Sequence, residues 1–107
     1  MQNTGDAGST HKAMNLTQKL NELTEQLKKS YETISVDVNK DTYFIMENGV
    51  VFQLLYLPPF NCFTISYADN LENANRDFFE EGDQFDADAD IEYLISEINK
   101  ELKAEAA

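Results

Sequence analysis

The side chains that could do chemistry in this sequence are mostly carboxylates. Asp86, Asp88 and Asp90 alternate along the chain, and Glu97 follows eleven residues after Asp86. This spacing matches positions 1, 3, 5 and 12 of an EF-hand loop, in which carboxylate oxygens surround calcium. Position 6 of such a loop requires glycine for a sharp turn, but Ile91 stands there and begins a helical apolar pattern. We therefore interpret these acids as the cap of a helix, and predict no metal and no other cofactor.

Residues of other catalytic types are few. The single histidine, His11, lies within residues 1–13, whose Gly, Ser, Thr and Asn content predicts a disordered tail that cannot hold a catalytic base in place. The sequence has no P-loop, no GxGxxG and no HExxH pattern. We therefore predict that the protein is not an enzyme. The single cysteine, Cys62, excludes an internal disulfide and suits a reducing cytoplasm, where we expect the protein. No apolar run approaches the roughly 20 residues that cross a membrane, so no membrane partner is expected.

The distribution of charge is the most unusual property of the chain. The formal net charge is −12, and residues 69–107 contribute −10 of it, with thirteen acids against three basic residues. Such a surface repels nucleic acid and attracts basic proteins. We predict that the partner is a basic protein, itself able to bind nucleic acid, and not nucleic acid directly. The acids that we expect to contact it lie at the end of one predicted helix and in the acidic loop that follows it: Glu80, Glu81, Asp83, Asp86 and Asp88.

The elements that must position these acids begin with a helix over residues 15–29. Asn15 and Gln18 form a capping box, and four leucines with spacings of 4, 3 and 4 form one narrow apolar stripe. A second helix is predicted from Asp69 or Asn70 to Gly82, and an acidic loop then leads to a final helix. The stripe of that final helix is Ile91, Leu94, Ile95, Ile98 and Leu102.

Four strands are expected between the first two helices. A two-residue Asn48-Gly49 turn would pair Ile45 with Phe52, and a four-residue loop of residues 58–61 would pair Tyr56 with Phe63. The predicted strands are residues 34–38, 42–47, 50–57 and 62–67. The fold class is thus α+β, with a four-stranded antiparallel meander and the order α-β-β-β-β-α-α, in a single domain spanning residues 14–107.

Because successive strand residues point to opposite faces, this register sorts the side chains. Phe52 and Ile65 fall on the Tyr/Phe-rich core face. The second face collects an apolar patch that is either covered by a helix or an interface between copies, and the former favours a monomer over a homodimer. The residues of this candidate interface are Phe44, Met46, Val51, Leu55 and Leu57.

In size, charge and architecture the chain is similar to acidic nucleic-acid-mimic inhibitors, such as anti-CRISPR, anti-restriction and nuclease-immunity proteins. This resemblance is general and is carried by no specific motif. It implies a non-enzymatic binding module whose carboxylates occupy the nucleic-acid site of a basic protein. The alternative is a self-associating structural or accessory domain that uses the second sheet face, with the acidic charge serving solubility alone.

Overall fold

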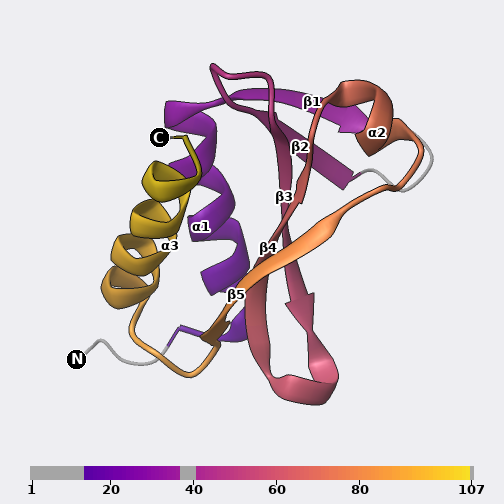
Figure 1. The fold of residues 1–107 in the computed structure, drawn as a ribbon. Coiled ribbons are helices and arrows are strands. Elements are labelled where there is room, and N and C mark those ends of the chain that lie inside the picture. The colour runs from indigo at the N-terminus through magenta and orange to yellow at the C-terminus, as the bar shows by residue number, and fades with distance from the viewer. Residues whose placement is uncertain (1–13, 37–40, 107) are drawn as a thin grey trace, which may run out of the picture.

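The computed structural model describes residues 14–36 and 41–106, which form an α+β fold with five strands and three α-helices (Figure 1). The strands follow one another across one antiparallel sheet in chain order, β1-β2-β3-β4-β5. The predicted tail, residues 1–13, lies outside the described residues. In chain order the elements are α1 (Leu16–Ser30), β1 (Glu32–Val36), β2 (Asp41–Ile45), β3 (Val51–Leu57), the 3-10 turn η1 (Pro58–Phe60), β4 (Cys62–Ala68), α2 (Leu71–Asn75), β5 (Glu80–Asp86) and α3 (Ile91–Ala106).

The first helix begins as its sequence predicts. The Asn15 side chain accepts a hydrogen bond from the Gln18 backbone N–H at 2.8 Å, and the Gln18 side chain accepts one from the Asn15 N–H at 2.9 Å. This reciprocal capping box satisfies two donors that an α-helix leaves unpaired at its start. Leu23 and Leu27 of the leucine stripe are buried, so the stripe faces the core.

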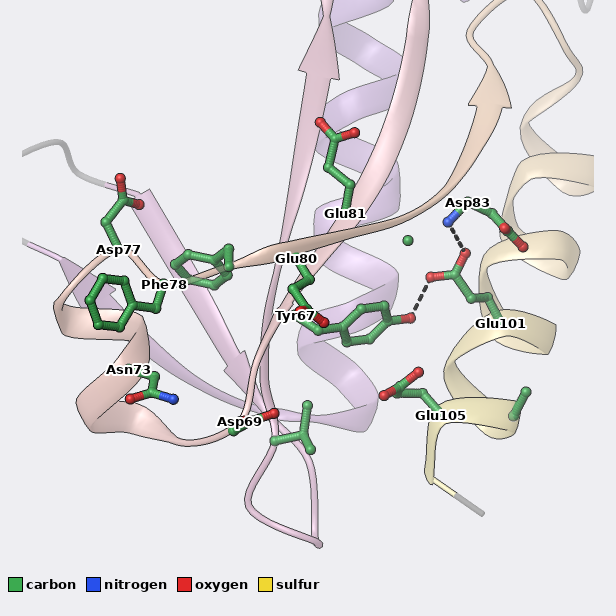
Figure 2. Close-up of a pocket in the computed structure, with 14 residues that line it drawn as sticks. Tyr67, Asp69, Asn73, Asp77, Phe78, Glu80, Glu81, Asp83, Glu101 and Glu105 are labelled. Atoms are coloured by element: carbon green, nitrogen blue, oxygen red, sulfur yellow. Dashed lines mark hydrogen bonds between the residues drawn. The ribbon is translucent and has the colours of Figure 1, made fainter.

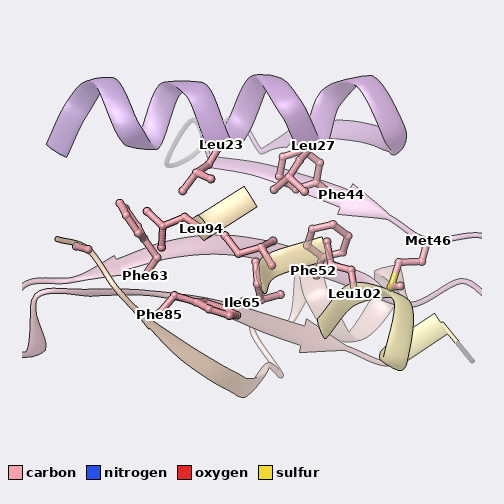
Figure 3. Packing of buried hydrophobic residues seen from close by; sticks show 12 residues of the cluster. Leu23, Leu27, Phe44, Met46, Phe52, Phe63, Ile65, Phe85, Leu94 and Leu102 are labelled. Atoms are coloured by element: carbon pink, nitrogen blue, oxygen red, sulfur yellow. The ribbon is translucent and has the colours of Figure 1, made fainter. Parts of the chain in front are cut away.

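The main core lies between α1, α3 and one face of the sheet. Both helices lie side by side on that face, and the stripe of α3 is buried through Leu94, Ile98 and Leu102 (Figures 1 and 3). Phe52 and Ile65 are completely buried beneath them, as predicted. The other buried members of this cluster include side chains from α1, from β2 and the residue that follows it, and from β4 and β5: Leu23, Leu27, Phe44, Met46, Phe63 and Phe85.

The β3–β4 hairpin has the predicted register, but the β2–β3 hairpin does not. Phe44 pairs with Phe52 and Ile45 pairs with Val51, one residue away from the predicted pairing of Ile45 with Phe52. The connection has three residues instead of two: the Gly49 N–H donates to Met46 O at 2.9 Å, and Gly49 has a φ of 91°. A three-residue hairpin loop with a left-handed glycine is a common alternative to the two-residue turn. The Asn-Gly pair therefore identified the hairpin without fixing its length.

This one-residue shift in register moves every β2 side chain to the opposite face of the sheet from the one predicted, because side chains alternate between the faces of a strand. Phe44 and Met46, at 1% and 3% exposure, belong to the main core. Val51 is buried in a second cluster on the opposite face, where Ala74 of α2 packs, and Leu55 and Leu57 are half-buried. The candidate interface is thus wrong as a single patch: its five residues divide between two faces, and three of them are buried within the chain.

The C-terminal third departs most from the prediction. The second helix has five residues, from Leu71 to Asn75, in place of the predicted span to Gly82. Residues 80–86, predicted as the end of that helix and part of an acidic loop, form β5 and pair with β4. Only Phe85 of this strand is buried, so its sequence lacks the alternating apolar pattern by which strands are recognised.

A lysine links the first helix to the segment before the last one. Lys19 Nζ donates to the backbone oxygens of Ala87 at 2.7 Å and Ala89 at 3.0 Å, in a partly buried site. Charge-assisted hydrogen bonds of this kind each contribute more than neutral ones. We expect Lys19→Met to lower the free energy of unfolding by about 1–3 kcal/mol, measured by urea denaturation.

The matched control is Lys28→Met, which removes the same charge. Lys28 is exposed, and its Nζ lies 3.6 Å from the Glu25 carboxylate. We expect that variant to change stability by less than about 0.5 kcal/mol. Equal losses in the two variants would contradict a role for the Lys19 hydrogen bonds.

Candidate functional site

An open groove of about 780 Å³ runs from α2 across β5 to the end of α3 (Figure 2). Its walls carry aromatic and small side chains, including Tyr67, Phe78 and Ala104. None of the described residues that line it is Lys, Arg, His, Ser or Cys. The lining carboxylates come from four separate segments: Asp69, Asp77, Glu80, Glu81, Asp83, Glu101 and Glu105. We call these seven the groove acids.

A β-bulge in β5 shapes the floor of the groove. Thr64 pairs with Gln84 and Ser66 pairs with Glu81, so two residues, Gly82 and Asp83, stand opposite Ile65. Bulges of this kind bend an edge strand and redirect its backbone. The Thr64 hydroxyl donates to Asp83 O at 3.0 Å.

Glu101 of α3 closes over this bulge. Its Oε1 accepts from the Asp83 backbone N–H at 2.9 Å, and its Oε2 accepts from the Tyr67 hydroxyl (Figure 2). The carboxylate is therefore held by two donors from two strands. It fixes α3 against the edge of the sheet, whereas the other six groove acids are exposed.

The surroundings of the Tyr67 hydroxyl change its pKa. Burial and the hydrogen bond to Glu101, together with the negative charges of Glu101, Glu105 and Asp83, raise the pKa of Tyr67 well above its ordinary value. Each of these causes disfavours the phenolate. Tyr67 therefore keeps its proton in the folded protein at pH values where a solvated phenol has lost it.

This shift predicts a pH dependence of stability. Above about pH 10 the unfolded chain releases the Tyr67 proton and the folded chain retains it, so stability falls as the pH rises. Below that pH both states are protonated and the contribution is complete. We expect urea midpoints recorded between about pH 8 and pH 11 to decline more steeply in the wild type than in Tyr67→Phe. Tyr93→Phe, which removes an exposed phenol, is the control. Equal slopes in the wild type and Tyr67→Phe would contradict the prediction.

The atoms around Gly82 leave no room for a side chain at this position. A Cβ added there would lie 3.0 Å from Ile65 O and 2.9 Å from Tyr67 Cε2, and would collide with the Glu101 carboxylate. The Ile65 oxygen belongs to the backbone and cannot rotate away. We expect Gly82→Ala to lower the free energy of unfolding by about 1–3 kcal/mol, measured by thermal and urea denaturation.

The control for this variant is Gln84→Ala, an exposed change in the same strand. It should alter stability by less than about 0.5 kcal/mol. A Gly82→Ala protein as stable as Gln84→Ala would show that α3 moves away from the bulge without cost.

Only some of the predicted partner-binding residues meet in the groove. Glu80, Glu81 and Asp83 line it, and the first two are exposed at the start of β5. Asp86 and Asp88 do not line the groove; they lie at the far end of β5, where Asp86 Oδ1 accepts from the Asp88 N–H at 2.9 Å. Three of the five predicted partner-binding acids are thus among the seven groove acids.

Two groove acids that were not predicted come from α3. Glu101 and Glu105 line the groove. They stand four residues apart, which places them on one face of a helix, and this spacing is the signal that could have identified them. Residues 80–86 were predicted as the end of a helix and part of an acidic loop, so nothing in the prediction placed them beside the final helix.

The acids with the EF-hand-like spacing do not come together around one point in the structure. Asp86 ends β5, the Asp90 carbonyl accepts from Leu94 N at 3.0 Å at the start of α3, and Glu97 bonds Lys100 at 3.2 Å. Within residues 14–36 and 41–106, no three His, Cys, Asp or Glu side chains are grouped so that they could hold a metal ion.

Comparison with models of protein families, with curated proteins and with solved structures finds no match to this chain. In the described part of the chain, no helix combines the length and the apolar character needed to cross a membrane. The functional argument therefore depends on the groove itself.

Proposed function

We propose that the protein is a non-enzymatic binding module whose groove engages a basic surface of another protein. The observation that carries this proposal is that seven acidic residues line one groove in which no described lining residue is positively charged. Carboxylates that no neighbouring positive charge neutralises are complementary to Lys and Arg side chains.

The aromatic residues of the groove support the same conclusion. Phe78 is 55% exposed, and the Arg76 guanidinium lies 4.8 Å from the centre of its ring. The ring thus attracts a cation of the chain itself, and a guanidinium or ammonium group of a partner would compete with Arg76 for the same cation–π attraction while the neighbouring carboxylates add attraction by charge. Basic side chains that ordinarily bind phosphate meet the same negative charge here, so the protein would act as a nucleic-acid-mimic inhibitor.

The alternative of self-association through the second sheet face has no specific observation in its favour. Phe44, Met46 and Val51 of that candidate interface are buried within the described chain. The high negative charge also opposes contact between two copies of the acidic side.

The experiment is the capture of basic proteins from the native host on the immobilised chain, followed by binding measurements on each recovered protein. A contact made by carboxylates should weaken by a factor of about ten or more between roughly 50 and 200 mM salt, and duplex DNA or heparin should displace it. Affinity that stays constant with salt, or a partner that binds DNA and this chain at the same time, would contradict the mimic.

A further inference from the structure

The outer edge of β5 is an open strand edge in the described part of the chain, where β5 pairs with β4 alone. Ala87 lies directly opposite Asn61 where the β4–β5 pairing begins, and its N–H donates to Asn61 O at 3.1 Å. This bond shows which residues of β5 direct their backbone groups towards β4. Because antiparallel strands alternate bonded and non-bonded pairs, the backbones of Gln84 and Asp86 are directed away from β4. Asp86 O is occupied by Ala89 N at 3.1 Å. The Gln84 N–H and C=O and the Asp86 N–H then face outwards.

The charges along this edge restrict what can pair with it. The exposed charged side chains of β5 are all negative: Glu80, Glu81, Asp83 and Asp86. A second copy of β5 would place carboxylates opposite carboxylates, which destabilises a strand pair, and the bulge further disfavours regular pairing. A strand with Lys or Arg at alternate positions would meet opposite charges instead.

The groove lies against the same strand. Four consecutive β5 residues, 80–83, line it, and the walls are supplied by the α2 side and by Glu101 and Glu105 of α3. Seven strand residues extend over about 20 Å. A segment laid along β5 would thus place one end in the groove and the other beside Gln84 and Asp86.

We propose that the partner of this protein contributes an extended, Lys/Arg-rich segment that joins the sheet as a strand beside β5. The proposal rests on the proposed function and adds the mode of recognition. Main-chain hydrogen bonds to Gln84 and Asp86 supply register, and alternate basic side chains reach the groove acids, in the manner of strand-addition complexes.

The test uses an eight-residue probe of alternating Lys and Val and a twin in which alternate backbone amides are N-methylated. The twin keeps every charge but cannot donate hydrogen bonds along one edge. We expect the unmodified probe to bind about two- to tenfold more tightly than the twin, because the twin cannot donate to the outward Gln84 C=O. We also expect it to slow amide hydrogen exchange at Gln84 and Asp86, observed by NMR. Gln84→Pro, which removes an outward N–H without changing charge, should weaken the probe, whereas Gln84→Ala should not.

The outcomes separate the two proposals. Equal binding of both probes with unchanged exchange at Gln84 and Asp86 would overturn strand addition and leave the acidic groove as a binding site. Capture of folded basic proteins by the groove, without binding of either probe, would have the same meaning. Failure of both probes together with failure to capture any basic protein at low salt would overturn the proposed function as well.

Discussion

Replacement of Phe52 by alanine is expected to lower the free energy of unfolding by about 3–5 kcal/mol. Phe52 is completely buried, and its ring centroid lies 5.1 Å from those of Tyr31 and Phe44 and 6.4 Å from that of Tyr67. The ring thus joins the end of α1 to three strands, and its loss removes contacts that rigid strands cannot restore by collapse. Small domains have only about 5–15 kcal/mol of stability in total, so this change should leave a marginal fold. Urea denaturation gives the difference directly.

Two further variants make this experiment a test of register. Gln53→Ala, on the opposite face of β3 and half-buried, should cost far less than Phe52→Ala. Phe44→Ala should cost nearly as much as Phe52→Ala, because both rings stack in the main core with an interplanar angle of 17°. The register expected from a two-residue turn would have placed Ile45 there instead. A larger loss in Ile45→Ala than in Phe44→Ala would therefore contradict the observed pairing of β2 with β3.

Neutralising the exposed groove acids together is expected to reduce partner affinity by about 100-fold or more at low salt. An exposed ion pair contributes only about 0–1 kcal/mol, so Glu80→Gln alone should be nearly silent and several changes must be combined. The variant combines changes to amides at four positions that leave the Glu101 hydrogen bonds intact: Asp77→Asn, Glu80→Gln, Glu81→Gln and Glu105→Gln. Affinity for a captured basic protein is the measurement, with circular dichroism to confirm that the fold persists.

A matched variant separates the groove from net charge. It neutralises four exposed acids that do not line the groove: Glu25, Glu32, Glu47 and Glu92. Both variants change the charge equally, but only the groove variant should lose its partner. Equal weakening in the two would show that long-range attraction, and not the groove, accounts for binding. Undiminished binding by both would leave solubility as the role of the acids.

The sequence by itself determined the elements whose signals are local. The capping box at Asn15 and the leucine stripe placed α1, and the apolar period from Ile91 placed α3. The two prolines before Asn61 fixed a four-residue loop and with it the register of β3 against β4. Caps, periodicity and proline act within a few residues, so each could be recognised without knowing the rest of the chain.

Three features depend on contacts between distant parts of the chain: the formation of β5, the face of the sheet on which each β2 side chain lies, and the groove. Residues 80–86 have one buried apolar side chain and form a strand because the free edge of β4 pairs with their backbone, an interaction that leaves no pattern in side-chain types. Both a two-residue and a three-residue loop are compatible with Asn48-Gly49, and the packing of Phe44 beneath the helices selects the longer one. The groove requires acids from the two segments that flank α2, from β5 and from α3 to lie along one surface, and Glu101 reaches β5 only because Gly82 leaves room for it. Each of these features is selected by how distant segments pack against one another, and that packing cannot be read from residue types within one segment.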